Sequence, residues 1–590
     1  MLISPDVNPF AATAKIAQAE RLTLDLETTG IHPFTGDTIA GVAIGVDGEC
    51  WYFPFGHEDV LDNLRPIFFK DLIRTINAKP RTIVGFNLKF ELNFLFAAGY
   101  PLSHYHTYLD AQILCHLTNE NELSMAMKEL SVKYVDKNAD KSESDLFYAL
   151  ERAGYVKGRG KNARPDKGQM WRLPAAVVEP YACMDVVLPE LLINARIGAL
   201  EAENNIDIWE ESNEYMQALH RMEAAGALID QGQVDKQWAE SARRRKELEQ
   251  QMYRLVGKEF NPASYPQVGA IIGQKETSKE ALKDCKHPLV PLLLEWRGWN
   301  RAITAYYEPF TTKKDHKGRI HPNFNQCTVI TSRLSCTDPN LQAVPKENDT
   351  YAVRQTIVAP PGKVILSFDY SQIELRMLAH YTRDPFLLRA YRENLDIHQE
   401  TADLLHIKRD DAKRINFGIV YGLGAESASA KLNISYNEAQ QLLNRYHKRI
   451  PGIKQIYSKS ESYARRHRNI PLWTGRRRHY KPYDEFQKAL SNLIQGGVGE
   501  IVRIAITTLD KEVIRKYPEV EMFLQVHDDI VFYVPEGLVA EIAPKVQHIM
   551  ENVEVFNVPI IAEGKVGKNW GKMQKLEEYL ASAKVAILSS

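Results

Sequence analysis

The sequence of 590 residues has little of what marks membrane, secreted or zinc-binding proteins. No apolar run approaches the roughly 18 residues that a membrane span needs. The N-terminus lacks the basic start and apolar stretch of a secretory signal. The six cysteines are scattered without a C-x-x-C pair, which predicts reduced thiols and argues against a zinc site or a disulfide framework. These absences predict a cytoplasmic protein without a membrane partner.

The chain also lacks net charge, internal repeats, low-complexity tracts and long linkers rich in proline, glycine or serine. The chain has 74 Lys and Arg residues and 75 Asp and Glu residues, so its formal net charge is −1. Any basic groove for a polyanion must therefore be local. A composition of 44% hydrophobic and 25% charged residues is that of an ordinary globular protein. The length predicts roughly three to five compact units.

The N-terminal third shows strands followed by helices. Residues 21–53 read as strands with turns (RLTLDLETTG, DTIAGVAIGV and ECWYFPF). Helical periodicity covers 65–200, broken near 155–172 by a basic, glycine-rich loop. Residues 207–257 predict long amphipathic helices, and a mixed, turn-rich segment extends to about 345. The pattern indicates an N-terminal α/β unit.

The rest of the chain mixes apolar strands with many helices. VILSFDY (364–370) predicts a strand, and residues 371–382 then take helical periodicity. Helices dominate 384–465 and 484–515. Residues 520–535 form two apolar runs around His-Asp-Asp, which predicts a hairpin with a charged tip. We expect a larger α+β unit here.

Three carboxylates are candidates for a metal site in this larger unit. Asp369 ends the predicted strand, and Asp528 and Asp529 occupy the predicted hairpin tip. Carboxylates gathered at such positions repel one another unless cations lie between them. Two Mg²⁺ ions placed there can stabilise both the attacking and the leaving oxygen of a phosphoryl transfer. The alternative is that the Asp pair is simply turn chemistry.

A basic and aromatic stripe supports the first interpretation. Arg409, Lys413, Phe417 and Tyr421 fall at every fourth position, so a helix places them on one slowly winding face. The two like charges repel unless a polyanion lies against them, and the two rings can stack on a base. Nearby glycines suggest close approach of a flat ligand or a helix that must bend: Gly418, Gly422 and Gly424. The alternative is a half-buried helix with a solvated basic end.

Four segments in this order resemble the motifs of family A (DNA polymerase I type) DNA polymerases. Three look like motifs A, B and C, and a fourth is similar to the stretch that lines the primer–template: DYSQIELR (369–376), RDDAKRINFGIVYG (409–422), QVHDD (525–529) and TSRLSCTDPNLQAVP (331–345). The resemblance covers roughly residues 20–590. It implies an α+β right-hand domain of palm, fingers and thumb that adds dNTPs to a primer 3′-hydroxyl on a DNA template.

The resemblance also implies roles for individual residues. Asp369 and Asp528 would hold two Mg²⁺ ions, for which Mn²⁺ can substitute, with Asp529 in support. Arg409 and Lys413 would grip the triphosphate. The other implied nucleotide contacts are Phe417 against the nucleotide, Tyr421 beside the templating base, Glu374 as the group that excludes ribonucleotides, and His527. The implied DNA contacts, largely in the minor groove, are Arg333, Asn340, Gln342, Gln495 and again His527. Contacts in that groove test pairing geometry without reading sequence.

Three positions depart from the family pattern. Asp529 stands where many members carry Glu, which shortens its reach. Phe417 replaces a Tyr, and in this family Phe goes with poor use of dideoxynucleotides. Ser491 occupies the place of a usual Asn, which puts one minor-groove contact in doubt.

A second set of carboxylates lies in the N-terminal unit. Asp25 and Glu27 are two apart on a predicted strand and share one face, whereas alone they would predict only a solvated edge. Together with Glu91, Tyr181 and Asp185 they resemble the Exo I, II and III motifs of DEDDy 3′→5′ exonucleases. The resemblance implies that the four carboxylates bind two metals and that Tyr181 orients the attacking water. Glu91 departs from the usual Asp, and misplacement of a metal by about an ångström can cost about a hundredfold in rate.

These readings predict a domain plan. We expect an RNase H-like α/β exonuclease domain with a mixed sheet and flanking helices, followed by the polymerase domain. The expected boundaries are 1–200 for the exonuclease, 201–590 for the polymerase, about 201–315 for the thumb, about 316–400 and 516–590 for the palm, and about 401–515 for the fingers. Exo I begins within 25 residues of the start, so a 5′-nuclease domain would have no room. That suggests a phage-like short form or a stand-alone replicative enzyme, acting in a bacterial cell or a phage-infected host.

The expected partners are primer–template DNA and dNTPs, for a monomer whose accessory replication proteins the sequence does not specify. Basic clusters predict phosphate-backbone contact, although short basic runs are usually solvated. They are Arg243, Arg244, Arg245 and Lys246; Arg465, Arg466 and Arg468; and Arg476, Arg477 and Arg478. Three alternatives stay open: a repair or gap-filling polymerase, a nuclease-dominant DEDD enzyme, and a catalytically dead nucleic-acid clamp.

Overall fold

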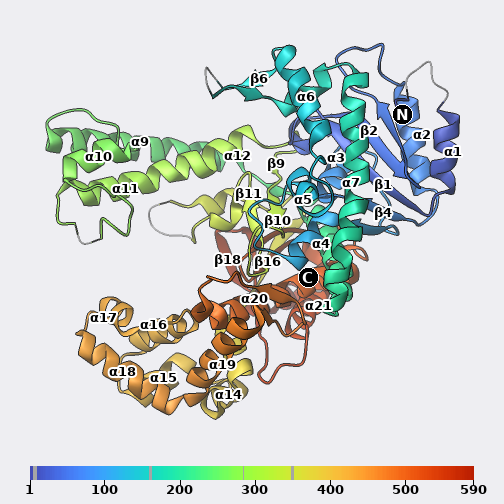
Figure 1. Ribbon diagram of the computed structural model, residues 1–590. Helices are drawn as coiled ribbons and strands as arrows, with labels where there is room; N and C mark the ends of the chain where they lie inside the picture. Colours follow the sequence, from blue (N-terminus) through green and yellow to red (C-terminus); the bar gives the residue numbers. More distant parts are fainter. Residues whose placement is uncertain (4–8, 159–161, 284, 347–350, 590) are drawn as a thin grey trace.

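The computed structural model describes residues 1–3, 9–158, 162–283, 285–346 and 351–589. Its N-terminal part is built on a mixed five-stranded sheet in the order β3-β2-β1-β4-β5 (Figure 1). The strands are β1 (Arg21–Thr28), β2 (Ile39–Val46), β3 (Glu49–Pro54), β4 (Thr82–Gly85) and β5 (Thr107–Asp110). β1, β2 and β3 pair antiparallel, whereas β4 and β5 join β1 in parallel. The expected α/β sheet is therefore present.

Helices flank this sheet. They are α1 (Phe10–Gln18), α2 (Pro66–Asn77), α3 (Lys89–Ala97), α4 (Ala111–Thr118), α5 (Met127–Tyr134), α6 (Lys141–Arg152) and the long α7 (Ala175–Ala202). α7 packs against β1, β2, β3 and β4. The prediction of helix throughout 65–200 is wrong at β4 and β5, because these four-residue strands are too short for periodicity to separate them from helix.

One helix joins the N-terminal sheet to the rest of the molecule. α8 (Ile206–Ala225) contributes Trp209 to the N-terminal core and Leu219 to the C-terminal core. The Trp209 indole N–H donates to the carbonyl of Asp110 at the end of β5, at 3.0 Å. At its other end, buried Glu223 pairs with Lys89 of α3 and accepts from the backbone N–H of Phe324 at 2.6 Å. α8 is thus shared by both units, and the expected boundary at 200 falls just before it.

The C-terminal part is built on an antiparallel sheet in the order β15-β16-β12-β17-β18. Its strands are β12 (Lys363–Tyr370), β15 (Glu521–Val526), β16 (Asp529–Pro535), β17 (Ala562–Asn569) and β18 (Lys572–Lys575). The predicted strand at 364–370 and the predicted hairpin at 520–535 are both confirmed. The helices α13 (Ile373–Thr382), α20 (Ala489–Leu509) and α21 (Val539–Glu551) share one large apolar core with the sheet.

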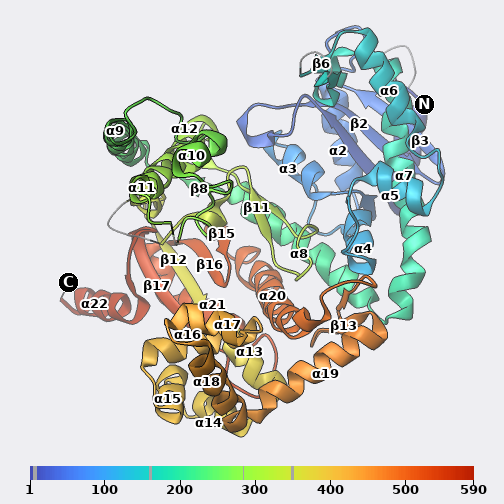
Figure 2. The ribbon, with the colours of Figure 1, turned by 60° about the vertical axis from the view of Figure 1, so that its left-hand side comes forward.

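Two groups of helices project from this sheet on opposite sides (Figures 1 and 2). One group is α9 (Gln231–Val256), α10 (Tyr265–Ile272) and α11 (Leu289–Ala302), with α12 (Glu308–Thr312) at its base. The other is α14 (Pro385–Arg392), α15 (Ile397–Leu405), α16 (Arg409–Val420), α17 (Ala425–Leu432), α18 (Tyr436–Arg449) and α19 (Pro451–His467). The segment predicted to be turn-rich before 345 is therefore largely helical up to α12.

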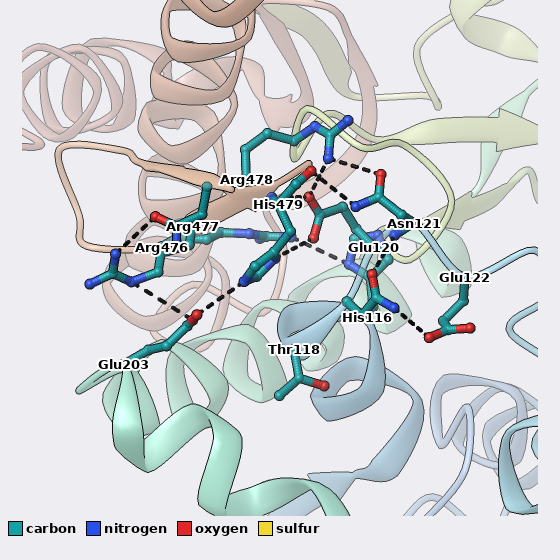
Figure 3. A network of polar contacts seen from close by, with 12 residues as sticks. His116, Thr118, Glu120, Asn121, Glu122, Glu203, Arg476, Arg477, Arg478 and His479 are labelled. Carbon is teal, nitrogen blue, oxygen red and sulfur yellow. Dashed lines mark hydrogen bonds and ion pairs between the residues drawn. The ribbon is translucent and has the colours of Figure 1, made fainter. Parts of the chain in front are cut away.

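The Arg476–Arg478 cluster has a structural task instead of the predicted phosphate contact. The hairpin of β13 (Asn469–Pro471) and β14 (Arg477–His479) meets the end of α4 and the end of α7 (Figure 3). Arg476 is buried and lies 3.3 Å from a carboxylate oxygen of Glu500 in α20. Arg478 is also buried and donates to Glu120 beyond α4 at 2.8 Å. Arg478 therefore ties this hairpin to the N-terminal unit, and Arg476 ties it to α20.

The other basic clusters are more exposed, and several of their members also have acidic partners. Arg243 pairs with Glu240 and Glu247 along α9, and Arg465 pairs with Glu461 along α19. All six cysteines are free thiols, as predicted. Among the described residues, no helix is long and apolar enough to span a membrane.

Candidate active sites

The first candidate site is a cavity of about 570 Å³ where the C-terminal sheet faces α16 and α20. Strand register fixes its carboxylates: Asp369 at the end of β12 lies opposite Asp529 at the start of β16. Asp528 occupies the tight turn between β15 and β16, next to His527, whose φ of 60° is left-handed. Asp369, Asp528 and His527 line the cavity, so the sequence prediction that these groups converge holds.

Burial and mutual repulsion make these carboxylates hard to ionise without cations. Burial and the charge of Asp369 raise the pKa of Asp528 to about 6. Burial also raises the pKa of Asp529 to about 7, although the Ser367 hydroxyl donates to it. Burial raises the pKa of Asp369 as well, against the opposing charge of Lys346. A divalent cation would relieve all three perturbations, so this donor set fits Mg²⁺ or Mn²⁺.

The predicted basic and aromatic stripe lies partly in the cavity. Lys413 and Phe417 of α16 line it. Arg409, at the start of α16, instead pairs with Asp396 at 2.8 Å. Tyr421 follows the end of the helix, half-exposed, and its hydroxyl lies 2.7 and 2.9 Å from the two oxygens of Glu374, another cavity residue. The middle of the stripe therefore lies in the cavity, and its two ends, Arg409 and Tyr421, lie outside the cavity lining.

The glycines of this segment end the helix. Gly422 has a φ of 74°, and its N–H donates to the carbonyl of Ile419 at 3.1 Å. The N–H of Leu423 donates to the carbonyl of Gly418 at 2.9 Å, which completes a Schellman motif. A Cβ on Gly418 would come within 2.7 Å of the Leu423 side chain. Two of the three glycines thus serve a helix terminus, and no flat ligand is needed to explain them.

The residues expected to contact primer–template DNA make contacts with their neighbours in this structure. Arg333 pairs with Glu374, so two predicted site residues meet. The side-chain amide of Gln342 donates to Gln525 at 2.6 Å. Asn340 is exposed, and its side chain accepts from the N–H of Ala343. Arg333 and Gln342 line the cavity, whereas Asn340 lies outside it.

Several cavity residues were not predicted from the sequence, among them Glu563, Lys346 and Gln525. Glu563 lies opposite Asp369 on the other side of β12, through pairing with β17. Lys346 follows the primer–template-like segment, and Gln525 begins the QVHDD motif. Glu563 carries no local signal, because only the strand pairing brings it to the site. Gln525 was quoted within a motif, and its polar side chain among apolar neighbours could have marked it.

The second candidate site lies in the N-terminal unit. Ligand atoms of Asp25 and Glu27 on β1 and of Asp185 on α7 all lie within 4.8 Å of one another. Glu91, from α3, is buried beside this group and its charge acts on Asp25, but it is not a member of the compact set. The structure thus brings all four predicted carboxylates to one place, with Glu91 at its edge.

The buried carboxylates of this second site repel one another, and positive charge would stabilise their ionised forms. Burial and then repulsion by Glu27 raise the pKa of Asp25 well above its usual range. Burial and Asp185 raise the pKa of Glu27 to about 8. One carboxylate oxygen of Glu27 and one of Glu91 are buried without a hydrogen-bond partner. Orphaned oxygens in a carboxylate cluster fit divalent cations, which are bound through oxygen ligands.

Two lysines that the sequence analysis missed also reach this site. Lys128 of α5 is buried and pairs with Asp185. Lys167, at the start of the short 3-10 helix η3 (Lys167–Arg172), contacts the hydroxyl of Tyr181 and lies 3.3 Å from Glu143. Tyr181 itself is 3% exposed. No motif marks these lysines, since both come from segments outside the three exonuclease-like motifs.

Comparison with known proteins agrees with this architecture. The chain is 28% identical over 94% of its length to DNA polymerase I of Pseudomonas aeruginosa, of which the alignment covers 64%. It is 30% identical over 65% of its length to the thermostable DNA polymerase I of Thermus aquaticus, of which 50% is covered. The chain thus spans less than two thirds of these curated relatives.

Among solved structures, the fold is similar to the POL domain of Pol1 from M. smegmatis in complex with DNA primer-template and dNTP. The TM-score is 0.78 at 23% identity, and the match covers 95% of this chain and 98% of that one. The model of DNA polymerase family A matches residues 231–572, which is more than half of the chain. The carboxylate hairpin, the α16 stripe and the projecting helices all lie within that span, and the chain belongs to DNA polymerase family A.

Proposed function

We propose that the chain is a DNA-templated DNA polymerase with a 3′→5′ proofreading exonuclease, acting in DNA replication. One observation carries the polymerase assignment: Asp369 and Asp528 share a single cavity with Lys413 and Phe417. A site that combines clustered carboxylates, a cation and a flat ring suits a metal-bound triphosphate joined to a base. The related Pol1 domain was solved with primer–template DNA and dNTP, which supports the same partners here.

In this proposal each group of the first site has a defined task. Asp369 and Asp528 would hold the divalent ions, which would supply positive charge to stabilise the attacking and leaving oxygens. Lys413 and Arg409 orient the triphosphate, and for that Arg409 must exchange its partner Asp396 for phosphate. Phe417 stacks on the nucleotide. The primer 3′-hydroxyl then gives up its proton to water, its oxygen bonds to the α-phosphorus, and the bond from that phosphorus to pyrophosphate breaks.

In the second site, Asp25, Glu27 and Asp185 form the main metal-binding set, with Glu91 as a further ligand. A bound ion makes hydroxide available near neutral pH. Tyr181 orients the attacking oxygen toward the terminal phosphodiester, and the 3′-oxygen of the preceding nucleotide leaves. The order of these parts along the chain supports an exonuclease domain at 1–200, followed by a polymerase domain with thumb, palm and fingers. The proposal takes the chain to act as a monomer.

The test is primer extension and primer degradation on a labelled primer–template with Mg²⁺, for wild type, Asp369→Ala and Asp25→Ala. We expect extension to vanish only in Asp369→Ala and degradation only in Asp25→Ala. A wild type that degrades but never extends would replace the polymerase assignment with the nuclease-dominant one. A wild type that binds DNA but does neither would favour a clamp.

A further inference from the structure

Lys167 and Tyr181 form a contact that the proposed exonuclease chemistry does not account for. The lysine amine and the phenol hydroxyl are hydrogen-bonded, and the amine lies 4.4 Å from the centroid of the ring. Lys167 comes from η3, whereas Tyr181 comes from α7, one helical turn before the metal-site residue Asp185. The contact therefore joins a loop segment to the helix that carries the cluster.

The chemistry of the two groups fixes the direction of this hydrogen bond. A lysine ammonium has three donors and no acceptor, so the phenol oxygen must accept. The phenol O–H then remains free to donate elsewhere. The negative charges of Asp185, Glu27 and Asp25, which belong to the carboxylate cluster, all act on this phenol. Lys167 thus donates to Tyr181, and the phenol O–H is left to donate to an acceptor in the site.

The surroundings keep this arrangement in place. Tyr181 is buried, and the amine of Lys128 lies 4.8 Å from its ring centroid on a second side. Lys167 is also anchored by Glu143 of α6, at 3.3 Å. Its side chain remains 40% exposed, so it stands where the site opens to solvent.

We propose that Lys167 is a positioning residue of the exonuclease site, which commits the Tyr181 hydroxyl to donate toward the attacking oxygen. This inference depends on the proposed exonuclease function. Without the lysine, the phenol oxygen can accept from water and its proton can turn away from the cluster. The attacking oxygen then loses a preorganised partner, for which losses of about 10- to 100-fold in rate are expected.

A double-mutant cycle distinguishes positioning from direct phosphate binding or general structural support. Hydrolysis of a single-stranded 3′ end is measured under single-turnover conditions for wild type, Lys167→Met, Tyr181→Phe and the double variant. We expect Lys167→Met to slow hydrolysis about 10- to 100-fold and to slow it less than about threefold further in the Tyr181→Phe background. Lys167→Arg should restore part of the rate, since Arg keeps the donor.

Two further measurements complete the design. Affinity for single-stranded DNA in EDTA should be unchanged in Lys167→Met, and primer extension should equal that of wild type, which shows that the variant folds. The matched control is Lys157→Met, in the short strand β6 (Val156–Lys157), whose exposed side chain pairs with Asp166 at 3.4 Å. It should leave hydrolysis unchanged.

The outcomes separate the two proposals. If wild type does not hydrolyse DNA, the exonuclease assignment fails. If wild type hydrolyses and Lys167→Met equals it, only the inference about Lys167 fails. If Lys167→Met slows hydrolysis equally with and without Tyr181→Phe, or weakens DNA binding in EDTA, the positioning role is wrong and a direct contact of Lys167 with phosphate is favoured.

Discussion

His479 connects the N-terminal unit to the C-terminal one through two carboxylates (Figure 3). Its ring nitrogens lie 2.8 Å from Glu120 and 3.1 Å from Glu203, and its side chain is 18% exposed. Burial alone would lower the pKa of His479, but the hydrogen bonds and charges of both Glu side chains outweigh burial and raise it to about 9. The substitution His479→Gln removes this charge and keeps a polar side chain of similar size.

The size of the effect follows from the two pKa values. The ordinary pKa of 6.5 and the folded value of about 9 differ by an amount equivalent to about 3 kcal/mol. Because the folded pKa is the higher one, this stabilisation is fully present below pH 6.5 and disappears as pH rises through 9. His479→Gln should therefore be much less stable than wild type at pH 6.5 and nearly equal to it at pH 9.5.

The assay is thermal unfolding of wild type and His479→Gln at pH 6.5 and pH 9.5. For a unit of 150–250 residues, about 3 kcal/mol corresponds to about 6–12 °C. Comparing the two proteins at each pH cancels the contributions of the other titrating groups. The matched control is His548→Gln, at an exposed position of α21. A difference between wild type and His479→Gln that is the same at both pH values would refute the reasoning.

Three further variants test other parts of the structure. Glu374→Ala should raise incorporation of ribonucleotides about tenfold or more, because a carboxylate of the cavity is removed; unchanged selectivity in primer extension with rNTPs contradicts its role. Phe417→Tyr adds a hydroxyl worth about 0.5–1.5 kcal/mol, so dideoxynucleotide termination should rise about two- to tenfold; equal termination bands disprove this. Glu223→Ala leaves Lys89 buried without a counter-charge and should destabilise the protein by about 3–5 kcal/mol in urea unfolding, whereas exposed Glu210→Ala should not.

Local patterns were enough to predict the parts of the sites that lie on regular elements. The apolar strand before Asp369 and the hairpin around Asp528 both have the predicted form, since an apolar run with a charged end specifies its own geometry. The stripe of α16 follows from helical periodicity in the same way. The resemblance to family motifs then indicated that the strand, the hairpin and the helix form one site, which periodicity alone cannot show.

The failures share a different cause, which is dependence on distant partners. Arg476 and Arg478 looked like a phosphate-binding cluster because sequence shows their charge and conceals their partners. Glu120 is more than 350 residues away from Arg478, and only the folded chain brings them together. Glu563 and Lys167 were missed for the same reason, because neither is marked by its neighbours in the sequence.

The shared helix α8 has a consequence for how a growing strand could be corrected. Its first half packs under the N-terminal sheet, and its second half contacts β15, the strand that leads to Asp528. Glu223 near its end also holds α3, the helix of Glu91. Both candidate sites are thus fixed to one continuous helix. We therefore propose that the fixed distance between the two candidate sites sets how far a mispaired primer end must move, and hence how many of its bases must unpair.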